Sequence, residues 1–159
     1  MPMTPLQYRL GDPPQQLTLG PEALATLDRY RQTRWYHLEA GGQLFARIYE
    51  REVVVEVASP PKRSDRRGRA FFKPSRRCEQ IEIDEMHTCG FHYVGDWHSH
   101  PEDVPTPSKK DIQSIGAAVR KSDHDLGGFL LLIVGRRPGQ RGIHLSIHDG
   151  SQSIELQPV

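Results

Sequence analysis

The pattern of apolar and polar positions predicts strands and helices that follow one another in mixed order. The clearest strand is Glu52–Ala58, where four of seven residues are valine. Gly128–Val134 is apolar after its glycine, which is typical of a central strand covered on both faces. Gly142–His148 alternates cleanly between apolar and polar residues, so we expect one of its faces to be half exposed.

Shorter segments add to the predicted sheet. Leu6–Leu10 and Gln16–Leu19 alternate around a Gly-Asp-Pro-Pro sequence, which predicts an N-terminal hairpin or two short strands within residues 1–20. Three further segments have strand character: Gly42–Ile48, Phe91–Trp97 and, more weakly, Ser153–Leu156.

Three segments repeat apolar residues at helical spacing: Ala23–Gln32, Ser75–Cys89 and Ser108–Lys121. Pro21 precedes the first, and Gly90 follows the second, as expected at helix starts and ends. Strands with helices between several of them predict an α/β or α+β fold built on one central sheet. At 159 residues, the chain is expected to form a single domain over residues 1–159.

Composition excludes several classes of protein. The sequence is 36% hydrophobic and 26% charged, with a net charge of +1, so no overall field favours nucleic acid or a membrane. We find no apolar run long enough to span a bilayer and no signal peptide at the start. Cys78 and Cys89 match neither a disulfide framework nor a zinc knuckle. These features predict a cytoplasmic protein with two reduced thiols.

Positive charge is concentrated in one segment. Residues 62–77 hold eight basic side chains against one acid, a net +7, so the rest of the chain is net −6. We interpret residues 61–77 as a basic insertion loop. Like-charge repulsion and its proline and glycine residues predict that it is mobile without substrate. We expect it to order against an acidic partner surface, with Phe71 or Phe72 as the apolar anchor.

The candidate chemistry lies directly after the predicted strand Phe91–Trp97. His98 and His100 are two residues apart, and alternate side chains of a strand share a face, so both imidazoles can reach one ion. Asp111 follows eleven residues later, on the first turn of a predicted helix. Two imidazoles and one carboxylate leave a tetrahedral position open, as in catalytic zinc sites, where bound water has a pKa of about 7.

Three other classes of enzyme with a similar histidine motif do not fit this sequence. Metallo-β-lactamases need Asp-His soon after the pair, where Pro-Glu-Asp stands here, and barrel amidohydrolases have roughly 250 residues against 159. Zinc deaminases need His-x-Glu with a later Pro-Cys-x-x-Cys, and neither is present. An isolated His-x-His is more often structural than metallic. Ser108 and Asp111 also fit a helix cap, and we expect this role to compete with metal binding by Asp111.

The full spacing resembles the JAMM signature of the JAB/MPN metalloproteases. His98, His100, Ser108 and Asp111 match its four key positions. The family also has an upstream glutamate before glycines, and Glu39 in Glu-Ala-Gly-Gly-Gln-Leu-Phe is similar to it, although Ala46 replaces a frequent glycine. The resemblance covers about residue 20 to about residue 135. It implies a curved mixed sheet flanked by helices, with zinc at one end of the sheet.

The resemblance also implies an activity, with a role for each matching residue. Zinc would be held by His98, His100 and Asp111, Glu39 would be the general base, and Ser108 would stabilise the oxyanion. The family implies a zinc isopeptidase or peptidase that cuts after the C-terminal residue of a modifier.

The residues around the site are most similar to small bacterial JAB proteins of CBASS anti-phage operons. This implies as substrate a protein conjugate linked through a C-terminus, such as that of a cyclic-nucleotide synthase. Two alternatives from other classes remain: a catalytically silent JAB-domain scaffold, and a nucleic-acid-associated relative of the RadC type. The second tends to have Asn where Ser99 stands, so nucleic acid is not expected as a partner. The composition gives no reason to expect a membrane partner either.

Overall fold

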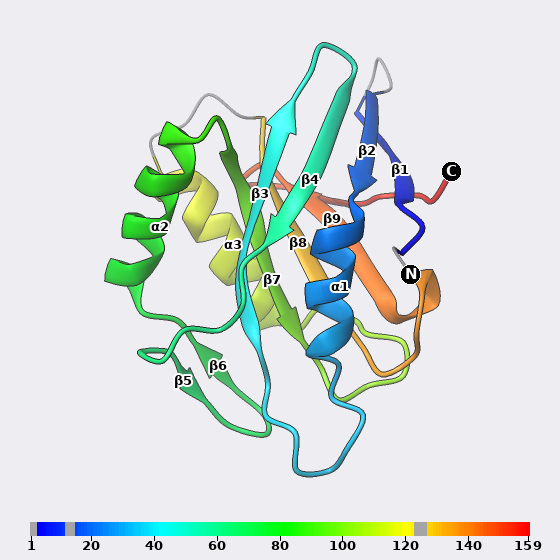
Figure 1. The fold of residues 1–159 in the computed structure, drawn as a ribbon, viewed down its shortest axis with the longest axis vertical. Coiled ribbons are helices and arrows are strands. Elements are labelled where there is room, and N and C mark those ends of the chain that lie inside the picture. Colours follow the sequence, from blue (N-terminus) through cyan, green and yellow to red (C-terminus); the bar gives the residue numbers. More distant parts are fainter. Residues whose placement is uncertain (1–2, 12–14, 123–126) are drawn as a thin grey trace.

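The computed structural model describes residues 3–11, 15–122 and 127–159. The large sheet contains β1 (Leu6–Leu10), β2 (Gln15–Leu19), β3 (Gly41–Ile48), β4 (Glu52–Ala58), β7 (His92–Ser99), β8 (Phe129–Val134), β9 (Ile143–His148) and β10 (Ser153–Glu155). Two short strands, β5 (Arg66–Arg67) and β6 (Phe72–Lys73), pair separately. The helices are α1 (Pro21–Arg29), α2 (Arg76–Thr88) and α3 (Lys109–Lys121), with a 3-10 turn at Gln140–Gly142 (Figure 1).

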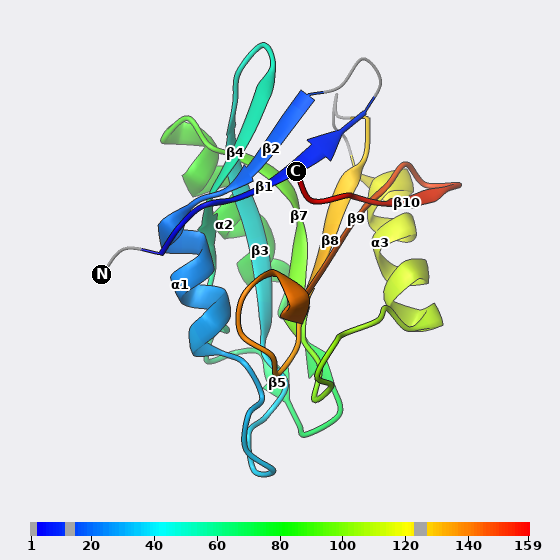
Figure 2. The ribbon, with the colours of Figure 1, turned by 90° about the vertical axis from the view of Figure 1, so that its right-hand side faces the viewer.

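The large sheet is mixed, in the order β1-β2-β4-β3-β7-β8-β9-β10. The pairs β2–β4 and β7–β8 are parallel, and the other pairs are antiparallel. The sheet is curled, and the chain beyond β10 returns to β1, where Arg9 N–H donates to the Gln157 carbonyl at 3.0 Å. Figure 2 shows α1 and α3 on opposite sides of the strands. The predicted curved mixed sheet flanked by helices is thus confirmed.

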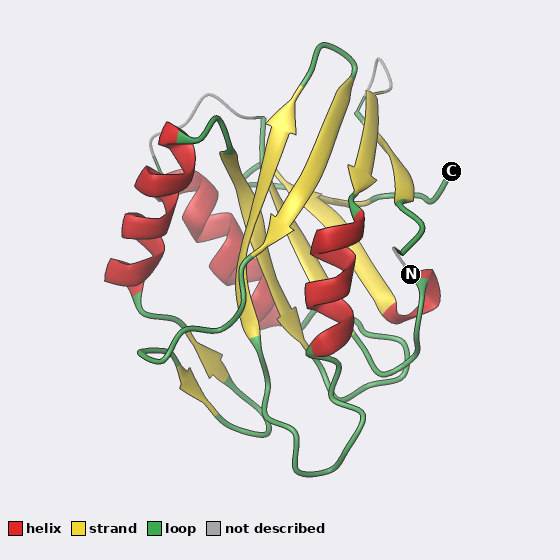
Figure 3. Cartoon of the chain, viewed as in Figure 1, coloured by secondary structure: helices red, strands yellow, loops and turns green. Residues whose placement is uncertain are grey.

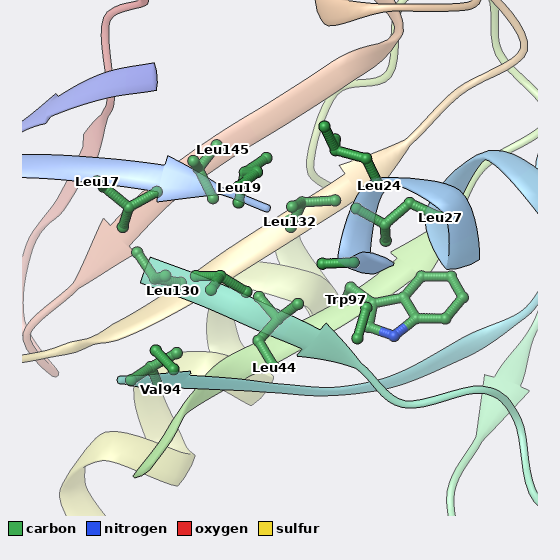
Figure 4. Packing of buried hydrophobic residues seen from close by; sticks show 14 of the residues in the cluster. Leu17, Leu19, Leu24, Leu27, Leu44, Val94, Trp97, Leu130, Leu132 and Leu145 are labelled. Carbon is green, nitrogen blue, oxygen red and sulfur yellow. The ribbon is translucent and has the colours of Figure 1, made fainter. Parts of the chain in front are cut away.

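Two apolar clusters hold the layers together. The larger one lies between α1 and the sheet, and Figure 4 shows Leu24 and Leu27 beside Trp97 and Leu132. The smaller one packs Ile115 and Val119 of α3 against the opposite side of β8. Full burial of one such side chain contributes roughly 1.5 to 3 kcal/mol to folding. Every residue of β8 is buried, as its apolar run predicts.

One strand differs from its expected exposure. The half-exposed face predicted for Gly142–His148 is wrong, because His144, Ser146 and His148 of β9 are all buried. Helix α3 packs on this part of the sheet. The Ser146 hydroxyl lies 3.0 Å from His144 Nε2 and 2.9 Å from His148 Nε2, so the polar groups satisfy one another. The alternating pattern correctly predicts a strand, but it does not reveal that a helix covers the polar side of that strand.

The basic segment, which we expected to be a loop, contains two short strands, and its mobility without substrate stays a prediction. The pair β5–β6 gives it regular structure, visible apart from the large sheet in Figure 3. The Gly68 carbonyl accepts a hydrogen bond from Glu39 N–H at 2.7 Å, and Arg67 Nε donates to the Glu39 carbonyl at 2.8 Å. These bonds fix the segment beside the residues that precede β3. Within the part of the chain that the structure describes, no helix is long and apolar enough to span a membrane.

Candidate metal centre

His98, His100 and Asp111 come together at the end of β7. His98 is the second-last residue of that strand, and His100 follows it directly. Their Nε2 atoms lie 3.1 Å apart. Asp111, from the first turn of α3, places Oδ1 3.3 Å from His98 Nε2 and Oδ2 3.3 Å from His100 Nε2. The parallel pairing of β7 with β8 requires a crossover, and α3 is the helix of that crossover.

Asp111 also caps the helix that carries it. Its Oδ2 accepts a hydrogen bond from Ser108 N–H at 2.8 Å, and Ser108 Oγ accepts one from Asp111 N–H at 3.1 Å. We expected capping and metal binding to compete; in the structure, the carboxylate accepts the cap bond while both of its oxygens lie 3.3 Å from an imidazole nitrogen. A carboxylate has two oxygens with about four acceptor directions, so one group can serve the cap and face the histidines together.

The donor set fits a divalent metal ion. The three ligand atoms lie within 4.8 Å of one another, and no second such group occurs among the described residues. Two imidazole nitrogens facing each other at 3.1 Å need a proton or a cation between them, because two lone pairs repel. Burial raises the pKa of Asp111, but hydrogen bonds from His100 and His98 outweigh it and hold that pKa well below the usual range. Two imidazoles and a carboxylate are donors that zinc accepts in tetrahedral sites.

Glu39 enters the same site from the segment just before β3, the strand beside β7. Gly41 pairs with His98, and Ala40 and Ser99 exchange hydrogen bonds, so continuing the antiparallel register places Glu39 opposite His100. The backbone of Glu39 is fixed by the basic segment on its other side. Burial raises the pKa of the Glu39 carboxyl, and the positive field of the two histidines partly opposes this. A raised pKa favours a carboxylate that takes up and releases protons.

Ser99, between the two histidines, is completely buried and has a structural role. Its hydroxyl donates to Gln32 Oε1 at 2.7 Å and accepts from Ala40 N–H at 2.9 Å. Both bonds secure the chain segment from which Glu39 projects.

All five predicted residues line one cavity of about 700 Å³: Glu39, His98, His100, Ser108 and Asp111. Phe71 and Phe72 form part of its wall on the side of β5–β6. The bond from Asp111 uses a lone pair of Ser108 Oγ and leaves the hydroxyl hydrogen available to a ligand.

Sequence reasoning missed the acidic end of this cavity, formed by Asp96 and Glu79. Tyr93 donates a hydrogen bond to Asp96 at 2.8 Å, and burial together with Asp96 raises the pKa of Glu79 to about 7. Asp96 is two residues before His98, so strand periodicity could have found it. Nothing in the sequence connects Glu79, on α2, with this site. Glu102, whose Oε1 is 3.0 Å from His100 Nδ1, was also missed.

Comparison with known proteins gives a consistent picture. The family model of prokaryotic homologues of the JAB domain matches residues 21–146. An Escherichia coli protein named CD-NTase/cGAS isopeptidase is 32% identical, over 73% of this chain and 74% of its own length. A Vibrio cholerae protein of the same name is 35% identical, over 68% and 69% of the two chains.

Two further similarities extend the comparison. A probable metalloprotease of Sinorhizobium fredii is 30% identical, over 65% of this chain and 66% of its own length. The solution structure of a Desulfitobacterium hafniense protein superposes with a TM-score of 0.61 at 22% identity, covering 87% of this chain and 88% of that one. At this identity, the structural likeness speaks for the fold alone.

Proposed function

Because the chain belongs to the family of prokaryotic homologues of the JAB domain, we propose that it is a zinc-dependent isopeptidase or peptidase that releases proteins from conjugates. The observation that carries this proposal is the convergence of His98, His100 and Asp111 in one cavity with Glu39 and Ser108. The cavity therefore offers a metal-ligand set, a candidate base and a hydroxyl donor. Amide hydrolysis needs an activated water, stabilisation of an oxyanion and a proton for the leaving nitrogen.

In this proposal, the metal is held by His98 Nε2, His100 Nε2 and the Asp111 carboxylate. When bound, zinc supplies Lewis acidity that polarises a carbonyl and lowers the pKa of water. Glu39 accepts a proton from the attacking water and passes it to the leaving nitrogen, a role that typically contributes 10² to 10⁴-fold. The Ser108 hydroxyl donates a hydrogen bond to the oxyanion.

The substrate class is suggested by the relatives. Two of them are named CD-NTase/cGAS isopeptidases, and one is named a probable metalloprotease. We propose that this chain acts in the cytoplasm on a protein joined to its target by a bacterial ubiquitin-like conjugation system. A cyclic-nucleotide synthase of a CBASS anti-phage operon would be the conjugated protein, and cleavage would follow its C-terminal residue.

The direct experiment uses a linear fusion in which such a synthase precedes a small acceptor protein. We expect the zinc-loaded enzyme to cut once, after the last residue of the synthase, and mass spectrometry of both fragments identifies the bond. Unfolded casein serves as the comparison substrate. Cleavage within casein and none at the junction would indicate a general protease. No cleavage of either substrate would favour a scaffold role.

The rim of the cavity next to β5–β6 is a candidate binding surface for the substrate. Phe72 is partly buried beside Gly41, whereas Phe71 is 51% exposed, so Phe71 is the better apolar anchor. Trp35 is 80% exposed, and the Arg69 guanidinium lies 5.6 Å from its ring. Exposed aromatic and arginine side chains beside a cavity suit an acidic protein surface. We propose that the rim binds such a surface of the conjugate.

Reversing two rim charges tests this assignment. Arg66→Glu with Arg69→Glu is expected to raise KM for the fusion roughly 2- to 30-fold, since each exposed ion pair contributes about 0.2 to 1 kcal/mol. Zinc content should not change. Arg67 is spared, because it binds the backbone of Glu39. The matched control reverses Arg51, which is exposed in the turn between β3 and β4 at the other end of the sheet.

Nucleic-acid binding by the same rim makes a different prediction. It requires affinity for DNA or RNA that falls steeply with salt concentration. If the rim variant lost such affinity and kept its KM for the fusion, the rim would be a nucleic-acid surface and our assignment would be wrong.

A further inference from the structure

One of the two histidines has a carboxylate behind it. His100 Nδ1 lies 3.0 Å from Oε1 of Glu102, while His100 Nε2 faces His98 and Asp111. Carboxylate oxygens are acceptors, so a neutral His100 ring that donates to Glu102 carries its proton on Nδ1. This leaves the Nε2 lone pair directed at the candidate metal position. We propose that Glu102 is a positioning residue, which fixes the tautomer and the ring orientation of His100 for metal binding.

The loop that carries Glu102 is itself held in place. Arg136 N–H donates to the Glu102 carbonyl at 2.7 Å, and Arg137 N–H donates to the Asp103 carbonyl at 3.3 Å. Arg136 Nε also lies 3.1 Å from Asp103 Oδ1. The backbone at Glu102 is therefore fixed by main-chain bonds that do not involve its side chain.

A buried arginine holds the segment after β8, which contacts the loop that carries Glu102. Arg31 is only 7% exposed, and its guanidinium donates to the carbonyls of Gly135 at 3.0 Å and Gly142 at 3.2 Å. The segment after β8 is thus anchored to the chain just beyond the end of α1, and in turn it holds the loop after His100. The Glu102 side chain remains 45% exposed, so core packing does not explain its position.

The two histidines differ in what supports them. His98 lies within β7, where its backbone is paired on both sides with Gly41 and Ile133. Among the residues described, no carboxylate lies within bonding distance of His98 Nδ1. His100 lies beyond the end of β7, where less of the sheet constrains it. A hydrogen bond from outside the ligand set matters most for the ligand that the strand supports least.

Carboxylates that orient metal-bound histidines typically contribute 10- to 100-fold to metal affinity. The test is therefore the zinc affinity of the purified, metal-free full chain, measured by competition with a chromogenic chelator. Glu102→Ala is expected to bind zinc roughly 10- to 100-fold more weakly than the wild type. Glu102→Gln, whose amide oxygen can accept the same Nδ1–H, should recover most of this loss.

Asp103→Asn is the matched control, since it removes the neighbouring negative charge from the same loop, while its amide oxygen can still accept from Arg136 Nε and hold the loop. Its zinc affinity should stay near that of the wild type. Three results would overturn the proposal: wild-type affinity in Glu102→Ala, an equal loss in Asp103→Asn, or no recovery in Glu102→Gln. Unfolding of metal-free Glu102→Ala in a thermal melt would also contradict it, because the side chain is assigned to the ring alone. The measurement uses zinc without substrate, so it stands apart from the proposed reaction.

Discussion

His98→Ala and His100→Ala are each expected to lose most of the bound metal and, with it, hydrolysis of the fusion by at least about 10³-fold. Each variant leaves one imidazole and one carboxylate, which is too few donors for the three-ligand site that catalytic zinc prefers. Lewis-acid activation contributes several kcal/mol, which corresponds to such a loss in rate. Elemental analysis after purification and after addition of zinc measures the first effect, and fusion cleavage measures the second.

His92→Ala is the control for these variants, because His92 is an exposed histidine at the start of the same strand. It should keep the metal content and activity of the wild type. Asp111→Asn is informative in another way, since the amide oxygen can still accept from Ser108 N–H while the charge is lost. We expect weaker metal binding with an intact helix start. A wild-type protein without stoichiometric metal, and without activity after zinc is added, would contradict the metal assignment.

Much of the fold could be predicted because its signals are local. Valine-rich Glu52–Ala58 is β4 residue for residue, since β-branched side chains favour the pleated strand whatever surrounds them. Ser75 and Ser108 cap α2 and α3, as serine does where its oxygen can accept an exposed helix N–H. The spacing of His98, His100 and Asp111 also predicted that these residues lie together, because a strand, a loop and a helix start join them over a short stretch of chain.

What the sequence did not reveal depends on contacts between distant segments. The burial of His144 and His148 follows from α3 packing over β9, which no pattern within β9 shows. The order in the basic segment comes from bonds between Gly68, Arg67 and Glu39. The composition of the segment gives its charge, but it does not show that Gly68 and Arg67 bind the backbone of Glu39.

Glu39→Gln is expected to retain zinc and to lose at least about 10²-fold in turnover of the fusion. The side chain keeps its shape, and Glu39 is assigned outside the metal-ligand set, so metal content should match the wild type. The amide cannot accept a proton from water, so the general-base contribution disappears. Glu85→Gln, which neutralises an exposed carboxylate on α2, should have no effect on either measurement.

Ser108→Ala separates base from oxyanion donor. It should also retain metal and slow turnover by about 10² to 10³-fold, the usual effect of losing one oxyanion donor. It also removes the cap of α3, which costs about 1 kcal/mol of stability, so its thermal melt must be measured beside its rate.

Glu39→Gln carries no such cost, because main-chain bonds hold its segment. If Glu39→Gln kept near-normal turnover with zinc bound, the base would have to be another carboxylate of the cavity. Glu79, whose pKa is raised to about 7, would then be the next residue to replace.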